Sequence, residues 1–142
     1  MSDVTTINHK EILPLLQEAQ RKTGFITEAD MIKIANSIGI SRSDVYGVAT
    51  FYSFLSVKPL GRNVIRICRS LPCHLKGGDS IMEALEKALG VKPGETTSDG
   101  KFTFTLTNCI GECDQAPAIL INDDVHGNLT PAKIAQILKS YK

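Results

Sequence analysis

Apolar residues recur every three or four positions through the first part of the chain, as they do on the buried face of an amphipathic helix. This spacing predicts a first helix from a cap at Asn8 towards Thr23, with Pro14 either kinking it or delaying its start. Thr27 with Asp30 resembles a capping box, which opens a second helix that a glycine ends. The apolar positions of these two helices are Ile12, Leu15, Leu16, Ala19, Ile34, Ala35 and Ile38.

A third helix is predicted after Ser41, because Ser41 with Asp44 repeats the capping pattern. Its apolar positions follow one another at helical spacing and predict one buried face. These positions are Val45, Val48, Ala49 and Tyr52. Three helices of this kind form a small helical bundle when their apolar faces meet.

Beyond Gly61 the apolar period changes from helical spacing to alternation and to short continuous runs. Alternation of apolar and polar residues is typical of a half-buried strand, and a continuous apolar run is typical of a core strand. The predicted order is strand, helix, three strands and helix, over 64–68, 79–89, 101–107, 118–121, 127–129 and a last helix that opens at Thr130 and Pro131.

The chain therefore divides near Pro59-Leu-Gly61 into a helical bundle, 1–60, and a second domain, 61–142. Strands and helices in the predicted order build a small domain with mixed strand pairing. The fold class is α+β, with a mixed sheet and two helices in the second domain.

Composition narrows the class of partner. The chain has 142 residues, of which 42% are hydrophobic, and its formal net charge is +1 without any basic run. This balance gives no electrostatic footprint for nucleic acid or for an anionic membrane surface. No apolar stretch approaches the roughly 20 residues of a membrane span, and 1–10 lacks a hydrophobic signal core. We expect a cytoplasmic protein without direct membrane insertion.

The candidate chemistry lies in four cysteines, which form two closely spaced pairs. Cys68 and Cys73 have four residues between them, and Cys109 and Cys113 have three. A [2Fe-2S] cluster takes four thiolates, and two short loops that follow strands can supply them in pairs. An iron-sulfur cluster is the leading interpretation.

Three other interpretations of the cysteines stay open on spacing alone. A structural zinc site also takes four thiolates, although its pairs more often have two intervening residues. Two disulfides are disfavoured in the reducing compartment that we expect here. Four buried cysteines without a common role would make their spacing a coincidence.

Several segments together resemble a known family, that of the E subunits of bacterial NADH:quinone oxidoreductase, which also supplies small subunits to NAD-linked hydrogenases and formate dehydrogenases. The similarity extends over nearly the whole chain in unchanged order. The segments are Tyr46-Gly-Val-Ala-Thr-Phe-Tyr-Ser53, Val64-Ile-Arg-Ile-Cys68, Cys73-His74, Lys92-Pro-Gly-Glu-Thr96, Cys109-Ile-Gly-Glu-Cys113, Ala116-Pro117 and Gly127-Asn-Leu-Thr-Pro131.

The resemblance implies a thioredoxin-like ferredoxin domain behind a short helical bundle. It also implies one [2Fe-2S] cluster with Cys68, Cys73, Cys109 and Cys113 as its ligands. The family places FMN and NAD(P)H on a flavin-bearing partner subunit, beside other iron-sulfur subunits of the same complex. A structural zinc site in a non-redox assembly module is the alternative.

No nucleotide fingerprint, nucleophile motif or general acid-base pair is present in the sequence. We therefore expect a non-catalytic electron-relay subunit with no activity alone. His74 is not expected to be a ligand, because four cysteines complete the coordination. The aromatic residues around Phe51 and Tyr52 are expected in the core or in a subunit interface.

Overall fold

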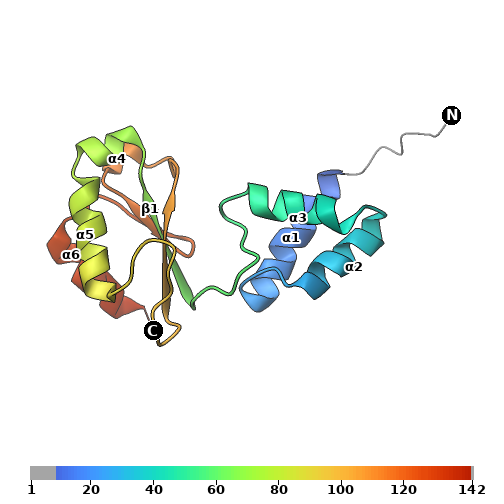
Figure 1. The fold of residues 1–142 in the computed structure, drawn as a ribbon. Coiled ribbons are helices and arrows are strands. Elements are labelled where there is room, and N and C mark those ends of the chain that lie inside the picture. The colour runs from blue at the N-terminus through green and yellow to red at the C-terminus, as the bar shows by residue number, and fades with distance from the viewer. Residues whose placement is uncertain (1–8, 142) are drawn as a thin grey trace. The chain divides into compact units, whose positions relative to one another are not determined.

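The computed structural model describes residues 9–141, and the chain divides after Pro59 into two compact units. The first unit is helical, and the second contains a sheet with helices (Figure 1). Within residues 9–141 no helix is long and apolar enough to cross a membrane.

The helical unit contains the three predicted helices, α1 (His9–Thr23), α2 (Glu28–Ile38) and α3 (Arg42–Phe51). Pro14 lies inside α1, and the predicted Asn8 cap lies outside the described residues. The core of this unit is formed by apolar side chains from all three helices and from the turn between α1 and α2. These are Ile12, Leu16, Ile26, Ile34, Ala35, Val45 and Ala49.

The caps of α2 and α3 are confirmed. The Thr27 hydroxyl accepts a hydrogen bond from the Asp30 N–H at 3.1 Å, and the Asp30 carboxylate accepts one from the Thr27 N–H at 3.1 Å. Ser41 accepts in the same way from the Asp44 N–H at 3.1 Å. Gly39 ends α2 at a φ of 71°, a left-handed conformation that glycine adopts without strain. These local contacts set where each helix begins and ends.

Tyr52 does not lie on the buried face of α3, so the prediction for this residue is wrong. The helix ends at Phe51, and Tyr52 has an extended backbone and is 43% exposed. Once the backbone leaves the helix, spacing by seven no longer places a side chain on the same face. Gln20 on α1 then holds the departing segment, because its side-chain amide donates to the Phe54 carbonyl at 2.8 Å and accepts from the Ser56 N–H at 2.7 Å.

The second unit is built on a four-stranded mixed sheet in the order β2-β1-β3-β4. The pairing of β1 with β2 is parallel, and the other two pairings are antiparallel. The strands are β1 (Asn63–Cys68), β2 (Phe102–Thr107), β3 (Ile119–Ile121) and β4 (Asp124–His126). The mixed sheet is as predicted.

Two long helices, α5 (Gly78–Leu89) and α6 (Pro131–Ser140), lie beside the sheet (Figure 1). Their apolar residues form one core with those of the strands. The core residues are Ile65, Ile67, Ile81, Leu85, Phe102, Phe104, Ile119, Ile121, Leu129 and Ile134. Two shorter elements, α4 (Leu71–Leu75) and the 3-10 turn η1 (Cys113–Gln115), lie in the cysteine loops.

The strand predictions need two corrections. The strand β1 is not half-buried, because every residue in it except Val64 is buried and even Arg66 is only 8% exposed. The last strand is 124–126 rather than 127–129. The turn between β3 and β4 is shorter than expected because Asn122 adopts a positive φ of 54°. The segment that was expected to be a strand instead supports a cysteine loop.

Candidate metal centre

The first cysteine pair lies where β1 leaves the sheet. Cys68 is the last residue of β1, and Cys73 lies in α4, a five-residue helix that the sequence did not predict. Both side chains are buried, at 3% and 2% exposure, in a small cluster with Ala116 against which Ile110 packs. The first pair is therefore held in an apolar environment at the carboxyl end of β1.

The second pair lies just beyond β2, and its side chains are exposed. The Sγ atoms of Cys109 and Cys113 are 3.3 Å apart, and the Gly111 N–H donates to the Cys109 Sγ at 3.4 Å. Gly111 has a φ of 87°, so glycine is the residue that lets this loop turn back on itself. All four cysteines are free thiols, so the two-disulfide interpretation is not supported.

Parallel pairing of β1 with β2 brings the two loops to one edge of the sheet. Cys68 is paired in register with Thr107, and the Arg69 N–H donates to the Thr107 carbonyl at 3.1 Å. Parallel strands end at the same edge, so the residues that follow them become neighbours. Cys109 comes two residues after β2, which places it beside the end of β1.

The thiols of the two pairs influence one another. A hydrogen bond with Cys109 is the largest influence that raises the pKa of Cys113, and the charges of Cys73 and Cys68 raise it further. Like charges in one place disfavour the ionised form of each group. The influence of Cys68 and Cys73 on Cys113 indicates that the two cysteine pairs lie near one another.

Cys68 has the opposite pKa shift to that of Cys73. Burial acts to raise the pKa of Cys68, but hydrogen bonds from Ser70, from the Cys73 thiol and from the Ile110 N–H together outweigh burial and leave this pKa lowered. Burial raises the pKa of Cys73 against the hydrogen bond that the Ala118 N–H donates to it. Donors that favour a thiolate are the groups that a metal-bound sulfur also uses.

A close backbone contact supports the second loop. The Asn128 N–H donates to the Gln115 carbonyl at 2.6 Å, and the Leu129 N–H donates to the Pro117 carbonyl at 3.1 Å. A Cβ atom on Gly127 would lie 2.6 Å from the Cβ of Gln115, so only glycine fits here. The segment after β4 therefore holds the turn that contains Cys113.

The two described histidine side chains have partners away from the sulfur atoms. The His74 Nδ1 lies 3.2 Å from an Asp79 carboxylate oxygen, and the His126 Nε2 lies 2.8 Å from the Tyr141 hydroxyl. Within residues 9–141, no group of three or more His, Cys, Asp or Glu side chains is placed so that it could hold a metal ion. The candidate donors are two pairs of free thiols, and a two-iron cluster takes its ligands as two pairs of thiolates.

Sequence reasoning missed one polar group at the site. The Ser70 hydroxyl lies 2.9 Å from the Cys68 Sγ. A hydroxyl residue two positions after a candidate ligand is the only signal in the sequence that could have indicated this contact.

Comparison with known proteins identifies the family. The pattern of thioredoxin-like [2Fe-2S] ferredoxins matches residues 3–142. The E subunit of NADH-quinone oxidoreductase from Escherichia coli (strain K12) is 46% identical over 127 residues, which are 89% of this chain and 76% of that protein. The corresponding protein of Pseudomonas aeruginosa is 41% identical over 126 residues, with the same two coverages of 89% and 76%.

A solved structure has the same fold as this chain. The crystal structure of an NAD+-reducing [NiFe]-hydrogenase in the air-oxidized state superimposes with a TM-score of 0.77 at 25% identity. The match covers 88% of this chain and 22% of the hydrogenase chain. The resemblance noted from the sequence is thus confirmed, and with it one [2Fe-2S] cluster as the cofactor of the fold. The chain belongs to the thioredoxin-like [2Fe-2S] ferredoxin family.

Proposed function

We propose that this chain is a non-catalytic electron-relay subunit that holds one [2Fe-2S] cluster in a multisubunit NAD(P)H-linked oxidoreductase. The proposed ligands are Cys68, Cys73, Cys109 and Cys113. The observation that carries the proposal is the parallel pairing of β1 with β2, which brings the two distant loops that hold these thiols to the same end of the sheet. When bound, a cluster of this kind takes up and releases an electron at a potential that its surroundings set.

Charged residues of the two loops act on that potential in opposite directions. Arg69 and Lys76 are exposed beside the first pair, and their positive charge favours the added electron. Glu112 and Asp114 adjoin the second pair, and their negative charge opposes it. Water screens exposed charges, so each contributes little on its own.

The proposed partner is a protein that binds flavin and NAD(P)H, with FMN on that partner and not on this chain. Support comes from the relatives, which are named as a component of NADH-quinone oxidoreductase, and from the NAD+-reducing hydrogenase. The proposed complex also contains other iron-sulfur subunits, and its proposed location is the cytoplasm. A non-redox zinc module is not favoured, because the family is one of [2Fe-2S] ferredoxins.

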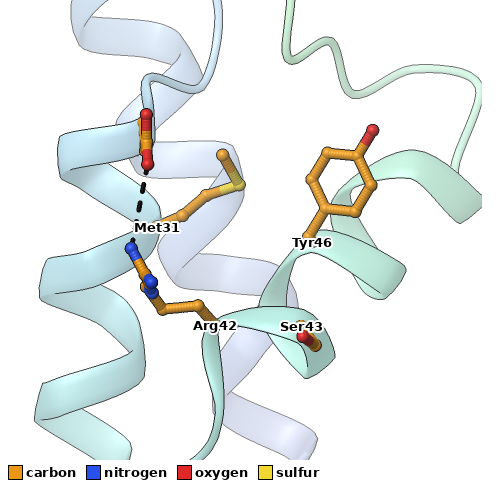
Figure 2. A pocket seen from close by; sticks show the side chains of 5 residues that line it. Met31, Arg42, Ser43 and Tyr46 are labelled. Atoms are coloured by element: carbon orange, nitrogen blue, oxygen red, sulfur yellow. Dashed lines mark ion pairs between the residues drawn. The ribbon is translucent and has the colours of Figure 1, made fainter.

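Exposed aromatic residues on the helical unit support docking to a partner subunit. Tyr46 is 52% exposed and Phe51 is 79% exposed, both on α3. Figure 2 shows Tyr46 beside a pocket between α2 and α3, where Met31 and Ser43 also line the wall. Aromatic side chains are enriched in protein interfaces, where they bury much area at low entropic cost.

The first experiment is an assay of iron, sulfide and zinc on the anaerobically purified chain, with EPR spectra before and after reduction. We expect two irons and two sulfides per chain and an EPR signal only after reduction. One zinc per chain without visible colour would instead indicate the assembly module.

Substitution then tests the ligands individually. Cys109→Ser should weaken the cluster or shift its spectrum, because an alkoxide is a poorer ligand for iron-sulfur clusters than a thiolate. Cys109→Ala is the matched control, since it offers no ligand atom at all and should lose more iron than Cys109→Ser. An unchanged spectrum in both variants would remove Cys109 from the ligand set.

Docking needs a separate test in the assembled complex. Tyr46→Ala combined with Phe51→Ala should reduce co-purification with the flavin subunit while iron per chain stays unchanged. Val125→Ala is the control, because Val125 is 46% exposed but lies on β4 in the other unit. Unchanged co-purification of the double variant would show that these two aromatic residues do not bind the partner.

A further inference from the structure

The Ser70 hydroxyl does not make the contact expected from its place in the chain. Ser70 is the N-cap residue of α4, and a serine at this position ordinarily accepts a hydrogen bond from an N–H of the first turn. Ser41 at the start of α3 does so, with the Asp44 N–H at 3.1 Å. Ser70 has no such bond, and its oxygen lies 2.9 Å from the Cys68 Sγ.

The direction of this hydrogen bond follows from the state of the sulfur. A thiol can donate or accept, but a thiolate bound to iron has no proton and only accepts. The Ser70 hydroxyl must then be the donor. Cys68 is 3% exposed and Ser70 is half-buried, so little water competes for the sulfur.

We propose that Ser70 is a positioning residue whose hydroxyl donates to the Cys68 sulfur of the bound cluster and raises its reduction potential. This inference rests on the proposed function, since it needs Cys68 as a ligand. Reduction adds negative charge, part of which falls on the thiolate ligands, so a donor to sulfur is worth more in the reduced state. Loss of the hydroxyl therefore lowers the potential.

Backbone donors act on the same sulfur, but they survive substitution. The N–H groups of Ser70 and Ile110 both favour the thiolate of Cys68. The hydroxyl can be removed while these groups stay in place, so its effect can be measured separately. Ser80 is the matched control, because it is an exposed serine on α5. Among the hydrogen bonds described, the Ser80 hydroxyl has none to a cysteine sulfur, whereas the Ser70 hydroxyl has one.

The test compares Ser70→Ala with Ser80→Ala in the full chain by redox titration, followed by EPR and visible absorption. We expect Ser70→Ala to shift the electron-transfer equilibrium towards oxidation by about tenfold, which is a fall of about 59 mV for a one-electron couple. Ser80→Ala should keep the wild-type potential. An unchanged potential in Ser70→Ala with full iron content would overturn the inference.

A second pair of variants covers the case in which Ser70→Ala loses the cluster. Ser70→Thr keeps a hydroxyl, and Ser70→Val has nearly the same shape as Ser70→Thr without one. A wild-type potential in Ser70→Thr with a lower potential or no cluster in Ser70→Val supports the inference. Equal potentials in these two variants, or loss of the cluster in both, contradict it.

Iron and sulfide contents separate this inference from the proposed function. A wild-type chain without iron and sulfide contradicts both. A wild-type chain with two of each, and with potentials that ignore the Ser70 hydroxyl, contradicts only the role of Ser70.

Discussion

Replacing Gly78 by alanine should destabilise the second unit, although alanine is normally the better helix residue. Gly78 is the first residue of α5 and is buried. A Cβ atom added there would lie 2.8 Å from the carbonyl oxygen of Cys73 and 3.1 Å from its carbonyl carbon. Both are backbone atoms, so no side chain can rotate away to relieve the contact.

The magnitude follows from two opposing effects. Exchange of glycine for alanine in a helix stabilises by about 0.5–1 kcal/mol. Overpacking of a close contact costs about 1–3 kcal/mol, and here the Cys73 turn must move by about half an ångström to restore ordinary separations. At the midpoints of these ranges overpacking wins by about 1 kcal/mol, and by up to about 2.5 kcal/mol at their limits; 1 kcal/mol is a fall of about 4–8 °C in melting temperature for a unit of this size.

Gly47→Ala is the matched control within α3. An added Cβ atom on Gly47 meets nothing within 4 Å, so only the helix preference acts and the helical unit should gain about 0.5–1 kcal/mol. The assay is thermal unfolding of the cluster-loaded chain by far-UV circular dichroism, with iron content measured beside it. Gly78→Ala should also hold less iron, because Cys73 moves with its carbonyl. A Gly78→Ala chain that melts at or above the wild-type temperature with full iron would refute the reasoning.

Three further predictions concern contacts outside the cysteine loops. Gln20→Ala removes two hydrogen bonds, so urea denaturation should show a loss of about 1–3 kcal/mol in the helical unit and the Ser56 amide should exchange faster. The hydrogen bond from the Thr27 hydroxyl lowers the pKa of Asp30 in the folded chain. The stability that the Asp30 carboxylate contributes is therefore complete above its unfolded pKa of about 3.9 and is lost as pH falls through the lower folded pKa. Acid titration of Thr27→Ala should show a smaller loss of stability than that of the wild type. Burial and a neighbouring carboxylate raise the pKa of Tyr141 to about 12, so the stability it contributes is complete below its unfolded pKa of about 10 and is lost as pH rises through 12. Ultraviolet titration of Tyr141→Phe should lack this high step, and a wild-type chain without that step would contradict the assignment.

The ends of the helices could be predicted because their signals are local. Thr27 with Asp30 and Ser41 with Asp44 are each three residues apart, and the hydrogen bonds between them form within one turn. Gly90 ends α5 in the same way as Gly39 ends α2, at a φ of 69°. A capping side chain meets its partner whatever the rest of the chain does, so these boundaries are readable without a tertiary structure.

Burial of the strands and the shape of the first cysteine loop could not be predicted in this way. Alternation in 64–68 predicted one exposed face, but β1 became a central strand and Arg66 was buried. The helix α4 has only five residues, too few for periodicity to indicate it. Both outcomes depend on which segments come to lie beside them.

The sequence by itself determined the four thiols, their pairing by spacing and the local elements that carry them. Only the tertiary structure decided that the loops of Cys68 and Cys109 would lie at the same end of the sheet, because the register of β1 against β2 depends on contacts between segments far apart in the chain. The same holds for Gly127, whose missing side chain admits Gln115 beside the second loop. The Ser70 hydroxyl is only two residues from Cys68, and it contacts the Cys68 sulfur instead of capping α4. Which of these two contacts forms depends on the path of the chain after β1.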